Sequence, residues 1–100
     1  MNRDFQFAAD MWLYSGEAAW HFLTLPVQVA EEIRFFHPKR RGKGWGSVRV
    51  DVQIGASRWD TSIFPDKESG SFLLPVKADI RRKEGLSIGR SCQVTLTVVG

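Results

Sequence analysis

The stretch Trp20–Arg34 reads WHFLTLPVQVAEEIR, and the stretch Ser71–Gly85 reads SFLLPVKADIRRKEG. In each stretch a short apolar run leads into Leu-Pro-Val, and a segment of helical composition that contains Ile-Arg follows. Proline cannot donate to a β-ladder but is accepted in the first turn of a helix, so each Leu-Pro-Val predicts a change from strand to helix. The repetition within 100 residues indicates two copies of one structural unit.

The flanking residues predict the same order of elements in each half. Alternation of apolar and polar residues predicts strands, and spacing of apolar residues by three or four predicts helices. The first half is predicted to form strands over 5–14, 20–25 and 47–54. A helix is predicted to begin at Val27, with Val27, Ala30, Ile33 and Phe36 or Phe35 on its apolar face, and to be stopped by Pro38. The second half is predicted to form strands over 58–64, 71–74 and 91–99 and a helix over 76–84. We expect Pro75 to open this second helix and Gly85 to end it.

A hairpin, a helix and a strand cannot by themselves bury both a sheet face and a helix stripe. Two such units related by a pseudo-twofold axis can close a small β-barrel, which removes exposed strand edges. The sequence therefore predicts a mainly β fold with two short helices that cover the open ends of a small closed β-barrel. Residues 1–100 are expected to form a single domain with repeats over about 5–54 and 58–99, competent as a monomer.

Several stretches resemble a bacterial family named domain of unknown function 1905. They are WHFLTLP (20–26), GWGSVRV (44–50), TSIFPDKESG (61–70) and LPVKADIR (74–81). This resemblance covers most of the chain in the right order and implies a double-split β-barrel. The second half also resembles the strand–Pro–helix–Gly–strand pattern of AbrB/MazE-type DNA-binding modules, which dimerise to complete a barrel. The resemblance implies a fold and no particular activity.

Composition narrows the classes of protein that the chain can belong to. No run of about 18 apolar residues is present, so no membrane-spanning helix is expected. The single cysteine, Cys92, excludes an internal disulfide and a Cys-x-x-Cys motif, and a reduced, cytoplasmic protein is the simplest interpretation. The net charge is +3 but is unevenly distributed, because residues 1–38 hold two basic and five acidic residues and residues 39–100 hold twelve basic and six acidic ones.

The residues that could carry catalysis or bind a metal have structural interpretations. Cys92 shares a strand face with valine and leucine, which predicts a small buried apolar residue. His21 lies in a predicted strand between aromatic residues, and His37 lies at a helix C-terminus, where an imidazole favours the last carbonyl groups. Two histidines and one cysteine at this spacing do not form a zinc pattern, and no phosphate-binding glycine loop is present. We therefore expect no enzyme, no cofactor and no metal site.

A candidate anion-binding site lies in the second predicted helix. Lys77 and Arg81 are four residues apart, so they share one helix face and could hold one phosphate or carboxylate together. The alternative is that they form ion pairs with Asp79, Glu84 or an acidic residue of a neighbouring strand, and the sequence does not decide between the two.

A second candidate feature is an aromatic cluster on the first hairpin. Trp12 and Tyr14 share one strand face, and Trp20 and Phe22 share a face of the next strand. If the hairpin brings these faces together, the four rings form a patch. The favoured interpretation is that the patch fills a barrel end; if exposed, it would bind a ligand or partner.

The expected function is non-enzymatic binding of an anionic small molecule or a protein partner near Lys77, Arg81, Trp12 and Trp20. The alternative is binding of nucleic acid, since a loop of cations beside an aromatic residue can hold phosphates and stack a base. The residues of that alternative are Lys39, Arg40, Arg41, Lys43, Trp45 and Arg82. A net charge of only +3 and an acidic first third argue against a dedicated DNA-binding protein.

Overall fold

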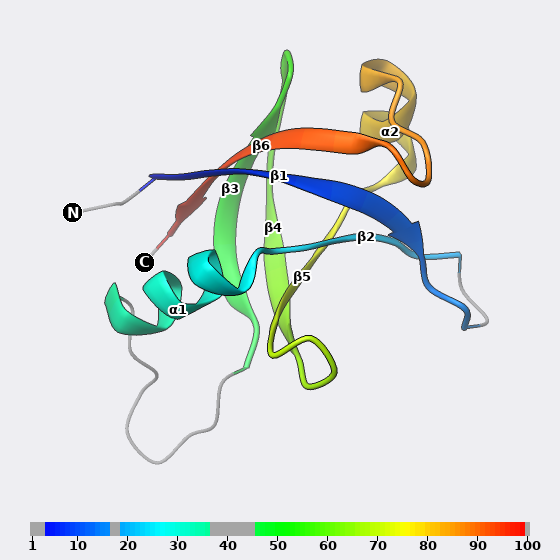
Figure 1. The fold of residues 1–100 in the computed structure, drawn as a ribbon. Coiled ribbons are helices and arrows are strands. Elements are labelled where there is room, and N and C mark those ends of the chain that lie inside the picture. Colours follow the sequence, from blue (N-terminus) through cyan, green and yellow to red (C-terminus); the bar gives the residue numbers. More distant parts are fainter. Residues whose placement is uncertain (1–3, 17–18, 37–45, 100) are drawn as a thin grey trace.

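A computed structural model describes residues 4–16, 19–36 and 46–99 (Figure 1). The strands of the first half are β1 (Asp4–Leu13), β2 (His21–Thr24) and β3 (Val48–Ile54), with helix α1 (Val27–Phe36) between β2 and β3. The strands of the second half are β4 (Ser57–Asp66), β5 (Ser71–Pro75) and β6 (Ser91–Val98), with helix α2 (Ala78–Glu84) between β5 and β6. Neither described helix is long and apolar enough to cross a membrane.

The six strands form a closed barrel in the order β1-β2-β5-β4-β3-β6, with β6 paired to β1. All neighbouring strands are antiparallel. The predicted mainly β fold, with two helices and a small closed barrel, is therefore confirmed. Closure leaves no long sheet edge to pair with another chain, because each strand has a partner on both sides over part of its length.

The two longest strands change partners partway along. Residues 4–10 of β1 pair with β6, whereas residues 11–13 pair with β2. In the same way, residues 57–63 of β4 pair with β3, whereas residues 64–66 pair with β5. The barrel wall is thus split at two places, between β1 and β2 and between β4 and β5. Figure 1 shows α1 beside the first split and α2 beside the second.

The pairing of the strands has a twofold symmetry between the halves of the chain. Aligning the two Leu-Pro-Val copies makes Thr24 equivalent to Leu73, and these two residues pair directly between β2 and β5. Aligning SVRVDVQI with SCQVTLTV makes Val52 equivalent to Leu96, and these also pair directly, between β3 and β6. A twofold axis exchanges the members of such a pair, so it passes through both contacts. Origin of the two halves by duplication stays a prediction.

The core consists of inward-facing residues of all six strands together with the inner faces of the helices. Alternation along β3 and β6 buries every second residue, as the sequence predicts. From the helices, Ala30 and Ile33 of α1 and Ile80 of α2 enter the same cluster. Ser71 is buried among these apolar groups, and its hydroxyl donates a hydrogen bond of 2.7 Å to the carbonyl oxygen of Leu25, which satisfies both polar groups.

Two details of the predicted helices are wrong. Pro75 does not open α2: it ends β5 opposite Phe22, and the helix begins at Ala78. Proline is tolerated at the end of a strand, where no further ladder N–H is needed, so Lys77 precedes the helix in an extended conformation instead of lying in its first turn. In α1 the predicted inner stripe does not extend to Phe35, which is 77% exposed, because the last helical turn runs beyond the core.

The end of α2 provides a test of the fold. Gly85 has a φ of 65°, in the left-handed region, and no atom lies within 4 Å of the position that a Cβ would occupy. Gly85→Ala should therefore lower the free energy of unfolding by about 1 kcal/mol through backbone conformation alone. Gly46→Ala is the matched control, since Gly46 also has an open Cβ position but no positive φ. Urea denaturation should show a change below about 0.5 kcal/mol for the control; equal losses in both variants would contradict the interpretation.

Candidate functional site

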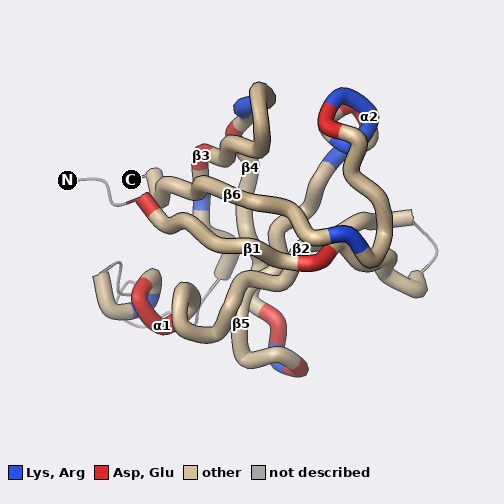
Figure 2. The backbone as a smooth tube through the Cα atoms, turned by 45° about the horizontal axis from the view of Figure 1, so that its top comes forward, with Lys and Arg blue, Asp and Glu red and all other residues tan. Residues whose placement is uncertain are grey.

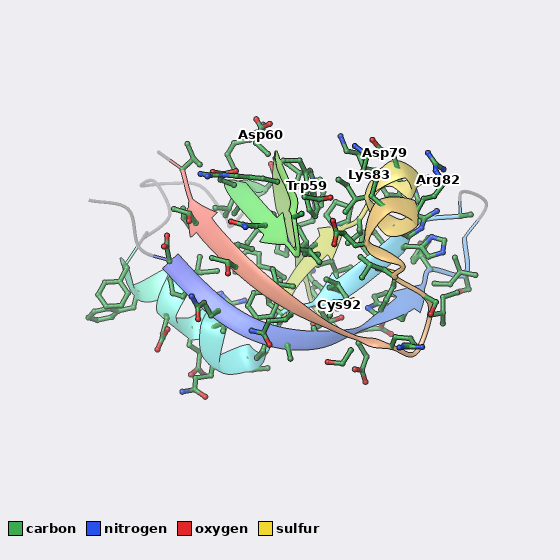
Figure 3. All side chains as sticks on the ribbon, turned by 90° about the horizontal axis from the view of Figure 1, so that it is seen from above. Trp59, Asp60, Asp79, Arg82, Lys83 and Cys92 are labelled. Atoms are coloured by element: carbon green, nitrogen blue, oxygen red, sulfur yellow. The ribbon has the colours of Figure 1, made fainter. Side chains whose placement is uncertain are left out.

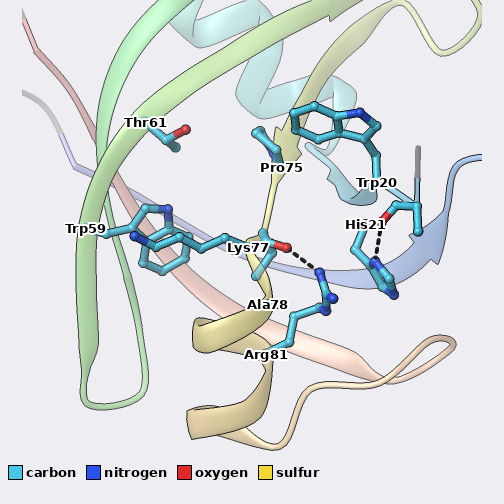
Figure 4. A pocket seen from close by; sticks show the side chains of 10 residues that line it. Trp20, His21, Trp59, Thr61, Pro75, Lys77, Ala78 and Arg81 are labelled. Atoms are coloured by element: carbon cyan, nitrogen blue, oxygen red, sulfur yellow. Dashed lines mark hydrogen bonds between the residues drawn. The ribbon is translucent and has the colours of Figure 1, made fainter. Parts of the chain in front are cut away.

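A cavity of about 400 Å³ lies between α2, β4 and the start of β2 (Figure 4). Its polar and aromatic lining consists of Trp20, His21, Trp59, Thr61, Lys77 and Arg81. Pro75, Val76 and two alanines complete the wall and make it largely apolar. A mostly apolar cavity of this size with a few convergent polar groups is typical of a site for a small organic molecule.

The split between β4 and β5 creates this cavity. Pairing of the two strands is confined to residues 64–66 of β4, so Trp59 and Thr61 have no β5 neighbour beside them. The end of β5 and the start of α2 lie across the opening. Space remains because α2 is a helix of only seven residues and buries a single side chain, Ile80.

The two splits of the barrel are filled differently. Phe5 pairs with Leu96 as Trp59 pairs with Val52, so the twofold axis makes Phe5 equivalent to Trp59. By the same alignment Phe7 is the equivalent of Thr61. Phe5 and Phe7 are buried, at 3% and 6% exposure, whereas Trp59 and Thr61 are only partly buried and line the cavity. The cavity is thus a departure from the symmetry of the barrel and not a consequence of it.

Lys77 and Arg81 both line the cavity, as the sequence predicts. The alternative, that they form ion pairs, is wrong for the described residues: Asp79 accepts a hydrogen bond from the Ile80 N–H, and Glu84 accepts one from Ser57. Arg81 donates from Nη1 to the carbonyl oxygen of Val76 at 2.9 Å, which holds its guanidinium group at the cavity. Two cationic side chains therefore reach the cavity with no acidic side chain opposite them in the described part of the chain.

The ion pairs of the described residues lie elsewhere, on the outer surface of the β3–β4 hairpin. Arg49 is 2.8 Å from Asp60, and Arg58 is 2.6 Å from Asp51. The hydrogen bond from Arg58 lowers the pKa of the Asp51 carboxyl group. These pairs leave the charge of the cavity uncompensated.

Two indole rings face the cavity from different strands. Trp20 precedes β2, and its ring stacks on Phe22 with centroids 5.9 Å apart and an angle of 5° between the planes. Trp59 projects from β4 on the other side of the cavity, and the side chain of Lys77 extends toward it (Figure 4). Phe22 supports one face of the Trp20 ring, so the opposite face remains for a bound molecule.

A hydrogen bond fastens α2 to the β3–β4 hairpin. The hydroxyl of Ser57 donates to a carboxylate oxygen of Glu84 at 2.6 Å. The same carboxylate lies against Gly55, whose φ of 58° lies in the left-handed region that favours glycine. This contact holds the helix that carries Arg81 against the strand that carries Trp59.

The predicted binding residues are brought together in part. Trp20, Lys77 and Arg81 line the cavity, whereas Trp12 does not. Trp12 packs against Phe22 with centroids 5.4 Å apart, and its indole N–H donates to the Thr24 hydroxyl at 2.8 Å. Trp12 therefore supports the cavity wall through Phe22. Trp59 and Thr61 also line the cavity and were not predicted as site residues, although the inward position of Trp59 in an alternating strand is a usable indication.

The aromatic cluster of the first hairpin forms as predicted, since Phe22 contacts Trp12, Tyr14 and Trp20. The favoured interpretation, that the cluster fills a barrel end, is wrong. Tyr14 is 48% exposed and Trp20 is 50% exposed. The cluster lies on the outer face because Phe22 alternates with the buried Leu23, and the hairpin extends past the barrel (Figure 1).

Most of the predicted nucleic-acid-binding residues lie outside the described part of the chain, namely Lys39, Arg40, Arg41, Lys43 and Trp45. His37 lies there as well. Arg82 is exposed on α2, and Figure 3 shows it near Lys83 on the same helix. Basic side chains are concentrated on α2, whereas α1 carries two glutamates and one arginine (Figure 2).

Cys92 and His21, the other described residues that could carry chemistry, lie in surroundings that suggest structural roles. Cys92, a residue of β6, is buried, as predicted (Figure 3), and burial, with a smaller contribution from the charge of Asp10, raises the pKa of its thiol. His21 is partly buried, and its Nδ1 lies 3.1 Å from the carbonyl oxygen of Ala19. No group of three or more His, Cys, Asp or Glu side chains that could hold a metal occurs within residues 4–16, 19–36 and 46–99.

The fold and the cavity together define a small closed-barrel domain with one helix-lined, cationic and aromatic pocket. Residues 7–96 match the family model described as domain of unknown function 1905, and the chain belongs to this family. The predicted resemblance to that family is therefore confirmed. None of the curated proteins compared with the chain matches it.

The surroundings of Cys92 predict how the thiol responds to pH. Because its pKa is raised in the folded protein, the unfolded thiol ionises first, and stability should fall as the pH rises above about 8.5. Cys92→Val, which keeps an apolar side chain in the core, should remove this part of the pH dependence. Thermal unfolding of both proteins between pH 7 and about pH 10 tests it; identical pH profiles would contradict the assignment.

Proposed function

We propose that this protein is a small, non-enzymatic binding module that holds an anionic organic molecule in the cavity between α2 and β4. The observation that carries the proposal is the pair Lys77 and Arg81, which reaches a mostly apolar cavity without an acidic partner among the described residues. Arg81 is partly buried beside apolar surface, which costs solvation free energy that an anion of the right shape restores, whereas the exposed Lys77 adds positive charge.

The composition of the cavity supports binding over catalysis. Its lining contains no carboxylate, and the one described thiol, that of Cys92 in β6, is buried elsewhere. Within the described lining the one hydrogen-bonding contact of the His21 ring is with the carbonyl oxygen of Ala19, so no nucleophile there is paired with a base. The cavity therefore offers groups that hold an anion and bury an apolar body.

Substitution of Arg81 tests this function. We expect mixtures of small carboxylates and phosphates at low ionic strength to raise the melting temperature of the native protein, because a ligand that binds only the folded state stabilises it. Arg81→Gln should weaken binding by about tenfold to a hundredfold, the usual effect of losing a charge-assisted hydrogen bond. Calorimetric titration of the best ligand gives the affinity.

Arg82→Gln is the matched control, since it makes the same change of net charge on the same helix at an exposed position outside the cavity. It should leave the affinity within about twofold of the native value, because an exposed charge contributes little at this distance. Equal losses in the two variants would show that net charge alone attracts the anion, and no stabilisation by any anion would overturn the proposal.

Binding of nucleic acid stays a prediction for the basic residues 39–43, together with Arg82. It requires that labelled single-stranded and duplex oligonucleotides bind at micromolar concentration and that binding weakens steeply with salt. Arg40→Ala with Arg41→Ala should then abolish binding, whereas Arg49→Ala, with an arginine already paired to Asp60, should not. Absence of binding at low salt, measured by fluorescence anisotropy, would exclude this second function.

A further inference from the structure

We infer that the molecule bound in the cavity is a planar aromatic carboxylate: its carboxylate meets Arg81 and its ring lies between Trp20 and Trp59. The inference rests on the proposed function and specifies the chemistry of the ligand. It draws on three observations: the hydrogen bond from Arg81 Nη1 to the backbone, the position of the two indoles, and the unequal filling of the two splits of the barrel.

The guanidinium group of Arg81 is held in an orientation that leaves one edge available to bind a carboxylate. Nη1 donates to the carbonyl oxygen of Val76, which fixes the plane of the group. Nε and Nη2, which form the other edge, make no hydrogen bond to a described residue. Two parallel N–H donors on one edge match the two oxygens of a carboxylate. A phosphate has a third oxygen that would need another donor.

The indoles determine the shape of the rest of the ligand. Trp20 is held flat against Phe22, so it presents one open face, and Trp59 approaches from β4 across the cavity (Figure 4). Two indoles on different walls of one cavity favour an aromatic ligand over a bulky aliphatic one. The cavity of about 400 Å³ accommodates a one- or two-ring acid but is small for a whole nucleotide chain.

Lys77 adds a second positive charge to the cavity but does not determine the orientation of the ligand. Its side chain extends toward Trp59 in Figure 4, and no hydrogen bond to a described residue fixes its ammonium group. A flexible point charge attracts any anion, whereas the fork of Arg81 selects the planar carboxylate. The two cations are therefore expected to contribute differently, Lys77 to attraction and Arg81 to specificity.

The symmetry of the barrel shows that the opening is a built feature. At the equivalent split two phenylalanines, Phe5 and Phe7, occupy the positions of Trp59 and Thr61 and are buried. Phenylalanine in place of Thr61 would fill the same space on this side as well. A polar, shorter side chain at residue 61 keeps the space beside Trp59 accessible, and a ligand ring can occupy the place that Phe7 takes at the other split.

Four probes of similar size test the inference on the native protein by calorimetric titration. They are 2-naphthoate, its saturated counterpart decahydronaphthalene-2-carboxylate, the uncharged 2-naphthylmethanol and 2-naphthyl phosphate. We expect 2-naphthoate to bind about fivefold to tenfold more tightly than the saturated acid, the usual contribution of aromatic stacking. It should also bind more tightly than the uncharged alcohol and the phosphate.

Variants assign the preference to residues. Trp59→Leu should remove the preference for the aromatic acid, whereas Phe64→Leu, at an exposed aromatic residue of the same strand outside the cavity, should retain it. Arg81→Lys, which keeps the charge and removes the fork, should weaken binding of 2-naphthoate by about tenfold. Circular dichroism and thermal unfolding confirm folding of each variant, and the comparison of probes on the native protein remains decisive if Trp59→Leu fails to fold.

The outcomes separate this inference from the function on which it rests. Equal affinity for the aromatic and saturated acids, or tighter binding of the phosphate, overturns the aromatic carboxylate and leaves anion binding standing. Binding of none of the three anions overturns both. A preference for 2-naphthoate that Trp59→Leu abolishes and Phe64→Leu leaves unchanged supports the inference.

Discussion

Neither half of this chain can close a sheet alone, because four of the six strand junctions join a strand of one half to a strand of the other. The pairing of Thr24 with Leu73 and of Val52 with Leu96 lies at two of these junctions, where equivalent residues meet. A shift of one residue at either place would turn the buried alternating side chains toward solvent. The registers at these contacts therefore hold the barrel, both splits and both helices in place.

Symmetry also explains where the chain has room for a ligand. Each of the two equivalent splits leaves space in the barrel wall. At the split beside α1, the buried side chains of Phe5 and Phe7 fill this space. Arg34 of α1 and Arg81 of α2, which each follow an isoleucine, also differ in their contacts. Arg34 donates a hydrogen bond to the carbonyl oxygen of Gly70 and lies over the ring of Phe72, 5.1 Å from its centroid. Arg81 donates one hydrogen bond, from Nη1 to the Val76 carbonyl oxygen, and lines the cavity. The residues that differ between the halves define the candidate site.

The order of elements, the closed barrel and the buried face of each strand followed from the sequence, because alternation and the two Leu-Pro-Val segments are local patterns. Lys77 and Arg81 were identifiable as a pair from helical spacing, although the strand end at Pro75 moved Lys77 out of the helix. Trp59 was not identifiable as their neighbour. It lies 18 residues before Lys77 in the chain, and only the departure of β4 from β5 brings the two side chains to one cavity.

By itself the sequence determined what each residue prefers locally: which positions alternate, where proline stops a ladder and where glycine ends a helix. It also predicted, from the order of elements, two copies of one unit. Tertiary structure alone decided that the aromatic hairpin is exposed, that Arg81 has no acidic partner among the described residues, and that one split is open. These outcomes depend on distances between segments remote in sequence, which local propensities do not encode.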